Sequence, residues 1–197
     1  MIIRLAKWED IQQVAKIHIQ EINRGFLTLL GEKFLKLLYG AMVSSAGSFL
    51  IVAESDGRVI GFASGSRDVR KLYSDFLKKY FLLILCAMLP KLFNVKVLSG
   101  IFDMIRYLFG KKDPNLPRAE FLMLAVKKEF RNSGVATSLF QELIKQMKVL
   151  GVQEFKLIVG ESLTAAIKFH ESMGCRFHSR FVLHKWQPSR IYIYGIK

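Results

Sequence analysis

The apolar residues of this chain follow two spacings in alternation. Short apolar runs bounded by turn residues predict strands at 2–5, 48–53, 59–63, 121–126, 154–159, about 176–185 and about 190–195. Apolar residues three and four positions apart predict helices at 9–22, 31–42, 139–147 and 165–173. The sequences Ser55-Asp56-Gly57 and Gln187-Pro188 predict turns between neighbouring strands. Strands interleaved with helices over 197 residues predict a single α/β domain, 1–197.

The segment at about 67–118 is too long for an ordinary connection and carries two further helical patterns. The first covers 69–84 and becomes apolar on every side in its last turns, and the second covers 98–109. These patterns favour a helical hairpin that packs on the sheet or forms a homodimer contact. Two alternatives stay open, a lid over a substrate and a peripheral membrane contact, because the pairs Lys78-Lys79 and Lys111-Lys112 flank the apolar turns.

Composition narrows the class of protein. The chain is 51% hydrophobic with a mean hydropathy of +0.25, yet its longest apolar run, 80–89, has ten residues. That run is short of the roughly 18 to 20 residues that span a bilayer. The N-terminus shows no signal-peptide pattern, and Cys86 and Cys175 lie too far apart in sequence to indicate a disulfide framework or a metal site. We therefore expect a cytoplasmic protein with reduced thiols and no metal.

The net charge of +14 is unusual and favours anionic partners. Nucleic acid, an anionic membrane surface and a polyanionic cofactor all fit it. The sequence contains no recognition helix, RNA-binding motif or zinc-finger pattern, which argues against sequence-specific nucleic-acid binding.

Residues 124–136, LAVKKEFRNSGVA, carry the strongest chemical signal. The apolar run ends at Val126, a polar turn follows, and a helical pattern begins directly afterwards. Backbone N–H groups at such a helix start have no helical acceptor, and the helix dipole adds partial positive charge there. Gly134 leaves room for an anion at the backbone, and Arg131 adds a cation. The stretch therefore predicts a diphosphate site made mainly of main chain.

This stretch resembles the pyrophosphate loop of the GNAT superfamily of N-acyltransferases, Arg/Gln-x-x-Gly-x-Gly/Ala, and residues 1–66 and 119–195 resemble that family in order. The resemblance implies a mixed, twisted sheet of six to seven strands flanked by helices, with 67–118 as a helical insertion. It also implies acetyl-CoA as cosubstrate, with its pantetheine arm between two splayed strands. The cofactor-binding residues that it implies are Leu124, Ala125, Val126, Arg131, Asn132, Ser133, Gly134, Val135, Ala136, Thr137 and Phe169.

Two side chains are catalytic candidates under the resemblance. Glu120 heads the strand that carries Leu124, where histone-acetylating members have a general base; the alternative is an exposed carboxylate paired with Arg118. His170 takes the position of the tyrosine that often protonates the CoA sulfur, and a histidine can donate a proton there or only pack beside the pantetheine. Leu163 stands where the family has an asparagine, so that contact with the cofactor is absent.

The function predicted is transfer of an acetyl group from acetyl-CoA to a primary amine, directly in a ternary complex. The apolar, basic segment 67–118 favours a small or carrier-linked acceptor such as an amino sugar. A protein or peptide N-acetyltransferase, a non-catalytic acyl-CoA-binding module and a membrane-surface module are the alternatives. The sequence does not identify the acceptor amine or distinguish acetyl from longer acyl groups.

Overall fold

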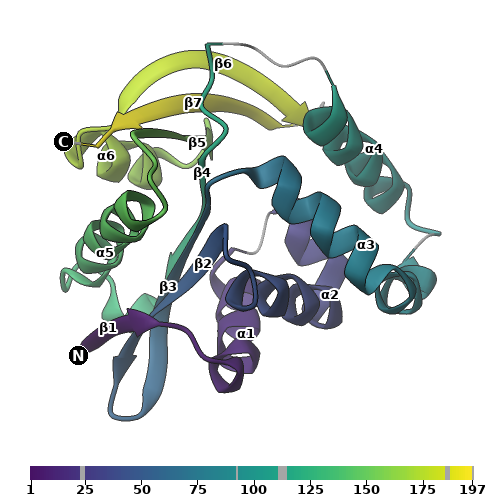
Figure 1. Ribbon diagram of the computed structural model, residues 1–197, viewed down its shortest axis with the longest axis horizontal. Helices are drawn as coiled ribbons and strands as arrows, with labels where there is room; N and C mark the ends of the chain where they lie inside the picture. The colour runs from purple at the N-terminus through teal and green to yellow at the C-terminus, as the bar shows by residue number, and fades with distance from the viewer. Residues whose placement is uncertain (23–24, 92, 111–114, 185–186, 197) are drawn as a thin grey trace.

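The computed structural model describes residues 1–22, 25–91, 93–110, 115–184 and 187–196. Its centre is a seven-stranded sheet with the order β1-β2-β3-β4-β5-β7-β6 (Figure 1). The strands are β1 Ile2–Leu5, β2 Ser48–Ser55, β3 Arg58–Ser66, β4 Glu120–Val126, β5 Glu154–Gly160, β6 Arg176–His184 and β7 Gln187–Gly195. All neighbouring strands are antiparallel except β4 and β5, which are parallel. The predicted mixed sheet of six to seven strands is confirmed.

Helices cover both faces of this sheet (Figure 1). One face carries α1 Ile11–Glu21, α2 Phe26–Val43, α3 Val69–Met88 and α4 Val95–Phe109, whose inward residues form one apolar cluster. The other carries α5 Val135–Val149 and α6 Thr164–Ser172, which form a second cluster. Short 3₁₀ turns lie at η1 Trp8–Asp10, η2 Leu89–Lys91 and η3 Lys128–Phe130. The sheet therefore separates two apolar layers.

The structure refines one predicted helix and corrects one predicted turn. The helix predicted at 31–42 is present within α2, and Gly31, with φ 83° and ψ 177°, separates it from a short helical segment that begins at Phe26. Glycine adopts this backbone without strain. Gln187 and Pro188, where a turn was expected, belong to β7 instead, and Gln187 pairs with His184. Proline is tolerated there because it precedes the central part of the strand. Lys185, where the sixth strand was expected to end, lies outside the described residues.

The two helices predicted between β3 and β4 are present as α3 and α4. Asp68 caps the first, because its side chain accepts hydrogen bonds from the N–H groups of Arg70 and Lys71 at 3.0 and 3.1 Å. Asn94 caps the second by accepting from Lys96 N–H at 2.9 Å. Lys111 and Lys112, expected to flank the hairpin, lie outside the described residues.

The inner faces of α3 and α4 pack into the first apolar cluster. Phe76 is 1% exposed and meets Phe34 of α2 edge to face at 5.5 Å between ring centroids. Val97 and Leu108 of α4 are 2% exposed. The hairpin is therefore part of the core, as the interpretation of packing on the sheet predicted.

The centre of the sheet is open between β4 and β5. Within the described chain their register contains only Glu120 opposite Lys156 and Phe121 opposite Leu157. Beyond these pairs β4 continues beside β3, and β5 continues beside β7. One edge of β4 from Leu122 onward is therefore left without a neighbouring strand.

A β-bulge lies where the two strands part. The register of β3 and β4 shifts between Ser64 and Gly65, which oppose Met123 and Phe121, so Leu122 is the extra residue. Because a bulge breaks the two-residue alternation, Leu122 and Met123 both pack toward the α1–α4 layer, whereas Leu124 packs toward the α5–α6 layer.

Candidate active site

The predicted phosphate-binding turn connects β4 to α5. Asn132 has φ 60° and Gly134 has φ 83°, so two left-handed residues turn the chain sharply into the helix. A Cβ built on Gly134 would meet nothing within 4 Å. The glycine is therefore required by its backbone conformation, and the space beside it is open toward the outside of the turn.

The start of α5 presents unpaired donors at this turn. The first hydrogen bond of the helix runs from Ser138 N–H to the Gly134 carbonyl at 3.0 Å. The N–H groups of Val135, Ala136 and Thr137 precede it and have no helical acceptor. In the described chain no side chain caps this helix. Three backbone donors and the positive end of the helix dipole thus lie together, which suits an anionic group.

Arg131 lies beside these donors, but it has a protein partner. Its Nη2 donates to Oε2 of Glu21 at 2.5 Å, and its Nε donates to the Val126 carbonyl at 3.3 Å. Glu21 also accepts from Lys128 N–H at 3.3 Å. Glu21, which the sequence analysis did not single out, therefore ties the end of α1 to the turn and holds the guanidinium at its base.

The turn leads from the open edge of β4. Leu124 and Val126 face the α5–α6 layer, and Ala125 faces the opposite layer. The Arg131–Thr137 turn and the unpaired edge of β4 are contiguous along the chain, which is the arrangement expected for a diphosphate with an extended arm attached. The residues present thus fit acetyl-CoA. The first N–H groups of α5 can bind its diphosphate beside the open space at Gly134, and the unpaired edge of β4 can pair with its pantetheine arm.

Glu120 is buried at the point where β4 and β5 part, with 6% of its surface exposed. Its Oε2 accepts a short hydrogen bond from the hydroxyl of Tyr107 of α4 and lies 3.2 Å from Nζ of Lys156 of β5. Lys156 Nζ also donates to the Pro117 carbonyl at 2.8 Å. The alternative of an exposed carboxylate paired with Arg118 is therefore wrong.

Tyr107 stays protonated beside this carboxylate. Burial raises the pKa of the Tyr107 hydroxyl far above its ordinary value, and the charge of Glu120 raises that pKa further. Tyr73 of α3 is also buried, and burial followed by the charge of Glu120 raises the pKa of its hydroxyl as well. Both contacts on Glu120 fall on Oε2, so within the described chain Oε1 is the oxygen available to accept a proton.

Strict alternation along β4 would place Glu120 on one face with Leu122, Leu124 and Val126, but the structure keeps only Leu122 on the side of Glu120. Glu120 and Leu122 face the α3–α4 layer, but Leu124 and Val126 face α5. The bulge at Leu122 accounts for the difference, because one extra residue reverses the alternation of faces.

His170 of α6 lies on the other side of β4 from Glu120. Its ring is 7% exposed and packs against Phe121, Phe140 and Phe169, with centroid distances of 5.4, 6.1 and 5.2 Å. Burial lowers the pKa of its imidazole to about 4, so the ring is neutral at pH 7. In the described chain its Nδ1 is buried without a hydrogen-bond partner.

This environment bears on both roles predicted for His170. A neutral ring cannot act as an imidazolium acid, although its N–H can still donate a hydrogen bond. The aromatic packing favours the alternative in which the ring, together with the half-buried Phe169, forms the wall beside the pantetheine. Proton donation by His170 stays a prediction.

A groove of about 600 Å³ lies elsewhere, between α1, α2 and α3. Trp8, Leu37, Tyr80 and Leu83 line its apolar part, and Lys33 and Lys36 lie at its polar part. None of the predicted site residues lines it. The predicted site residues therefore lie on β4, on the turn that leads into α5 and on α6, not at this groove.

Tyr107, Tyr73, Lys156 and Glu21 complete the site and were missed by the sequence analysis. Tyr107 and Tyr73 are part of apolar helical stripes, where an aromatic residue indicates core. One signal was available for Lys156: a lysine within the apolar run of β5 is rarely buried without a charged partner. The identity of that partner could not be predicted, because it depends on which strand lies beside β5.

Comparison with known proteins agrees with this geometry. Residues 97–175 match the sequence model of the Acetyltransferase (GNAT) family. N-alpha-acetyltransferase 30 of Schizosaccharomyces pombe is 36% identical over 80 residues, which are 39% of this chain and 53% of that protein. The chain thus spans about half the length of the curated relative that it matches.

Solved structures share the architecture over the whole chain. Ard1 from Thermoplasma volcanium has a TM-score of 0.64 at 17% identity, covering 100% of this chain and 97% of that one. YncA from Salmonella typhimurium, solved with its cofactor acetyl-CoA, has a TM-score of 0.63 at 14% identity, covering 100% and 94%. The chain has the GNAT fold, and its match to the family's sequence model covers residues 97–175.

Proposed function

We propose that this chain is an acyl-CoA-dependent N-acetyltransferase that transfers an acetyl group directly to a primary amine in a ternary complex. The observation that carries the proposal is the turn at Gly134. There a left-handed glycine, three amides that precede the first helical hydrogen bond and the open edge of β4 follow one another along the chain. Acetyl-CoA would supply the acetyl thioester.

In this proposal each part of the turn has a separate role. The N–H groups of Val135, Ala136 and Thr137 bind the diphosphate, and the guanidinium of Arg131, which Glu21 orients and partly neutralises, lies at its base. Main-chain groups of Leu124, Ala125 and Val126 pair with the pantetheine arm. A main-chain N–H near Val126 stabilises negative charge that develops on the carbonyl oxygen.

Glu120 is the proposed proton acceptor for the amine. Tyr107 and Lys156 hold its Oε2, so its rotamer is fixed and Oε1 accepts the proton, directly or through one water. The carboxylate lies on the α3–α4 side of the sheet, which therefore becomes the acceptor side. His170, on the opposite side, lies where the departing sulfur is expected, and it either donates a hydrogen bond there or only shapes the wall.

The acceptor that we favour is a small or carrier-linked amine, such as an amino sugar. Tyr107 of α4 reaches Glu120, so the hairpin forms part of the acceptor pocket and leaves the carboxylate 6% exposed. A buried carboxylate suits a compact amine, because little more than the reactive nitrogen has to reach it.

A peptide N-terminus is the second candidate acceptor. The relative that is 36% identical over 80 residues is named as an N-alpha-acetyltransferase, and this favours an α-amino group as nucleophile. An N-terminal amine also presents one compact nitrogen.

Release of free CoA thiol from acetyl-CoA, measured with a panel of amino sugars and short peptides, tests the proposal and separates the two acceptors. We expect thiol release that depends on the acceptor, either with the amino sugars or with the peptides. The Gly134→Glu variant should show no such thiol release. Calorimetry with CoA alone gives an independent check. The enzyme assignment is wrong if wild-type protein gives no binding heat, or if Gly134→Glu leaves that heat unchanged.

A further inference from the structure

An exposed apolar surface lies on the outer side of the α3–α4 hairpin, which we call the outer hairpin surface. More than half of the large apolar side chains that are exposed in the described chain lie between residues 77 and 105. Phe81 is 62% exposed, Leu82 71%, Phe93 93%, Val95 78% and Phe102 65%. Apolar exposure concentrated in this way on one hairpin marks an interaction surface.

These residues recur at helical spacing within the two helices. On α3, which is kinked at Tyr80, Phe81, Leu82 and Leu85 follow the kink at the spacing of one helix face, and Lys78 lies just before it. On α4, Val95, Leu98, Phe102 and Ile105 recur in the same way, all exposed. The core contacts of both helices are made by other positions, such as Phe76 and Leu108, so the core does not explain these stripes.

The charge around the outer hairpin surface is strongly positive. Residues 69–109 contain seven Lys and Arg against two Asp. Of the two acids, Asp103 is buried and Asp75 pairs with Lys71 at 3.2 Å. The exposed apolar stripes are therefore bordered by cations whose field is hardly offset by exposed carboxylates.

We propose that the outer hairpin surface docks onto an anionic lipid bilayer, with its apolar side chains at the headgroup boundary and its lysines against anionic headgroups. An amphipathic helix with a cationic border binds membranes in this way. None of the described helices has the length and hydropathy of a membrane span. The exposed apolar residues lie on the outer side of the hairpin, so the proposal places both helices along the membrane surface. A second copy of this chain is a poorer occupant, because it would bring its own charge of +14 against the same cations.

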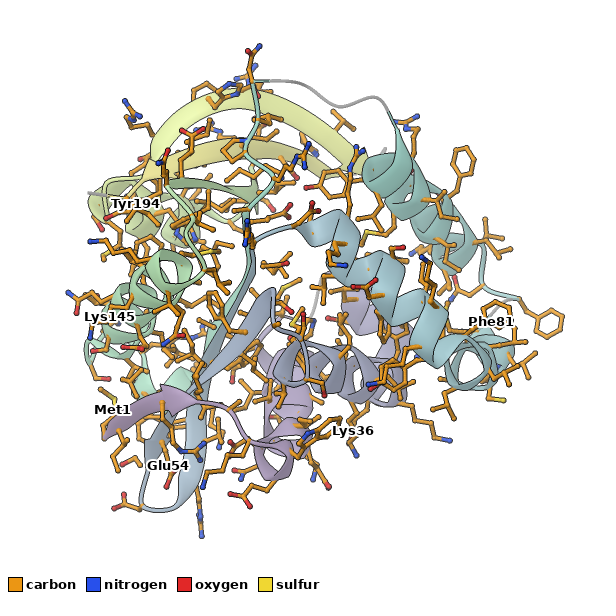
Figure 2. The ribbon with its side chains drawn as sticks, viewed as in Figure 1. Met1, Lys36, Glu54, Phe81, Lys145 and Tyr194 are labelled. Atoms are coloured by element: carbon orange, nitrogen blue, oxygen red, sulfur yellow. The ribbon has the colours of Figure 1, made fainter. Side chains whose placement is uncertain are left out.

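The inference is independent of the proposed acetyl transfer, because its readout is vesicle binding. Figure 2 shows Phe81 at one edge of the molecule and Lys145 of α5 at the opposite side. The two sides of the molecule therefore offer matched variants, one set on the hairpin and one set away from it.

Sedimentation of the full chain with vesicles of phosphatidylcholine, with and without about one third phosphatidylglycerol, tests the proposal. We expect binding to the anionic vesicles and little binding to the neutral ones. Lys78→Glu with Lys79→Glu should weaken the partition coefficient at least tenfold, since each cation near an anionic surface contributes about fivefold. The control Lys145→Glu with Lys148→Glu makes the same change of net charge on α5 and should bind nearly as wild type does.

The apolar part is tested with Leu82→Ser and Val95→Ser, matched by Leu5→Ser and Val149→Ser, which remove the same side chains from β1 and α5. We expect the hairpin pair alone to lose vesicle binding tenfold or more, with unchanged circular dichroism. Equal loss in both pairs, or no vesicle binding by wild type, overturns the proposal. So does a dimer in analytical ultracentrifugation that the hairpin pair dissociates and anionic vesicles do not, since a second copy would then cover the surface.

Discussion

At the scale of single residues, the site depends on contacts between distant parts of the chain. Glu120 could be singled out from the sequence because it heads the strand before the turn motif. Its partners could not, because Tyr107 comes from α4 and Lys156 from a strand paired with β4 through two residue pairs only. A sequence shows how residues are spaced along one helix or strand. These contacts depend instead on how α4, β4 and β5 pack against one another.

The first prediction concerns Glu120. Glu120→Gln keeps the shape of the side chain and removes its ability to accept the amine proton, so thiol release with the acceptor should fall tenfold or more, in line with contributions of about 10² or higher from general bases. Glu142→Gln on α5 removes an equal charge away from the site and should keep wild-type turnover.

Binding of CoA by both variants, measured by calorimetry, shows that the cofactor side is intact. A Glu120→Gln protein that binds CoA and turns over at nearly the wild-type rate would remove the base assignment.

The second prediction concerns pH and the two buried histidines. Burial lowers the pKa of both His170 and His18 to about 4, whereas the unfolded chain titrates near 6.5. Between these values the unfolded state binds protons that the folded state does not, so stability rises with pH and is lost as pH falls from 6.5 toward 4. Each histidine contributes roughly 3 kcal/mol over this window.

Denaturant unfolding at pH 7.0 and pH 4.5 measures this dependence. The variant His170→Phe should show a shallower loss of stability than wild type, because the group that titrates only in the unfolded chain is gone. His178→Phe, at an exposed position of β6, is the control and should keep the wild-type slope. A slope for His170→Phe equal to that of wild type would contradict the prediction.

At the scale of elements, the sequence predicted the strand, turn and helix of the proposed phosphate site but not the bulge within the strand. The turn is local, because Gly134 and the start of α5 depend on neighbouring residues and on a left-handed backbone that glycine favours. The bulge at Leu122 arises from the register between β3 and β4, and nothing in the apolar run 121–126 marks it. For this reason the strand and the turn could be placed from the sequence, whereas the faces on which the β4 side chains lie could not.

The third prediction separates the conformation of Gly134 from its role in binding. Gly134→Ala should lower the free energy of unfolding by about 1–2 kcal/mol, because an L-residue is strained at positive φ. Gly151→Ala is a matched control, with φ 69° and open space around its Cβ position, and should cost about as much. Gly134→Glu should in addition abolish CoA binding, because its carboxylate lies where the diphosphate is expected.

Calorimetry with CoA and denaturant unfolding give the two readouts. Loss of CoA binding in Gly151→Ala would show that backbone strain far from the turn also disturbs CoA binding. The result for Gly134 would then no longer indicate that its turn binds CoA.

At the scale of the whole molecule, the α3–α4 hairpin cannot be treated as a removable addition. Its inner residues belong to the same apolar cluster as α1 and α2, and Arg70 Nη2 donates to the Gly110 carbonyl at 2.9 Å, which joins the two ends of the hairpin. The sequence predicted the two helices from their period. The sequence did not predict what these apolar faces pack against. A helical apolar stripe indicates that one face is covered, but it does not identify the element that covers it.

The fourth prediction follows from this packing. Phe76→Ala leaves a cavity beneath α3 and should lower the free energy of unfolding by about 3–5 kcal/mol, with a single transition for the whole domain. Phe102→Ala, at an exposed position of α4, should change it by less than about 1 kcal/mol. Two separate transitions in Phe76→Ala would show that the hairpin folds apart from the sheet.

The extra residue at Leu122 has a consequence for the order of the proposed reaction. Because Glu120 faces α4 and Leu124 faces α5, the proposed reaction would bring the nucleophile and the thioester together from opposite sides of the sheet. Neither molecule then blocks the other, and a spent donor can depart before the acylated product does. Initial-rate plots at several fixed concentrations of one reactant should accordingly intersect, not run parallel.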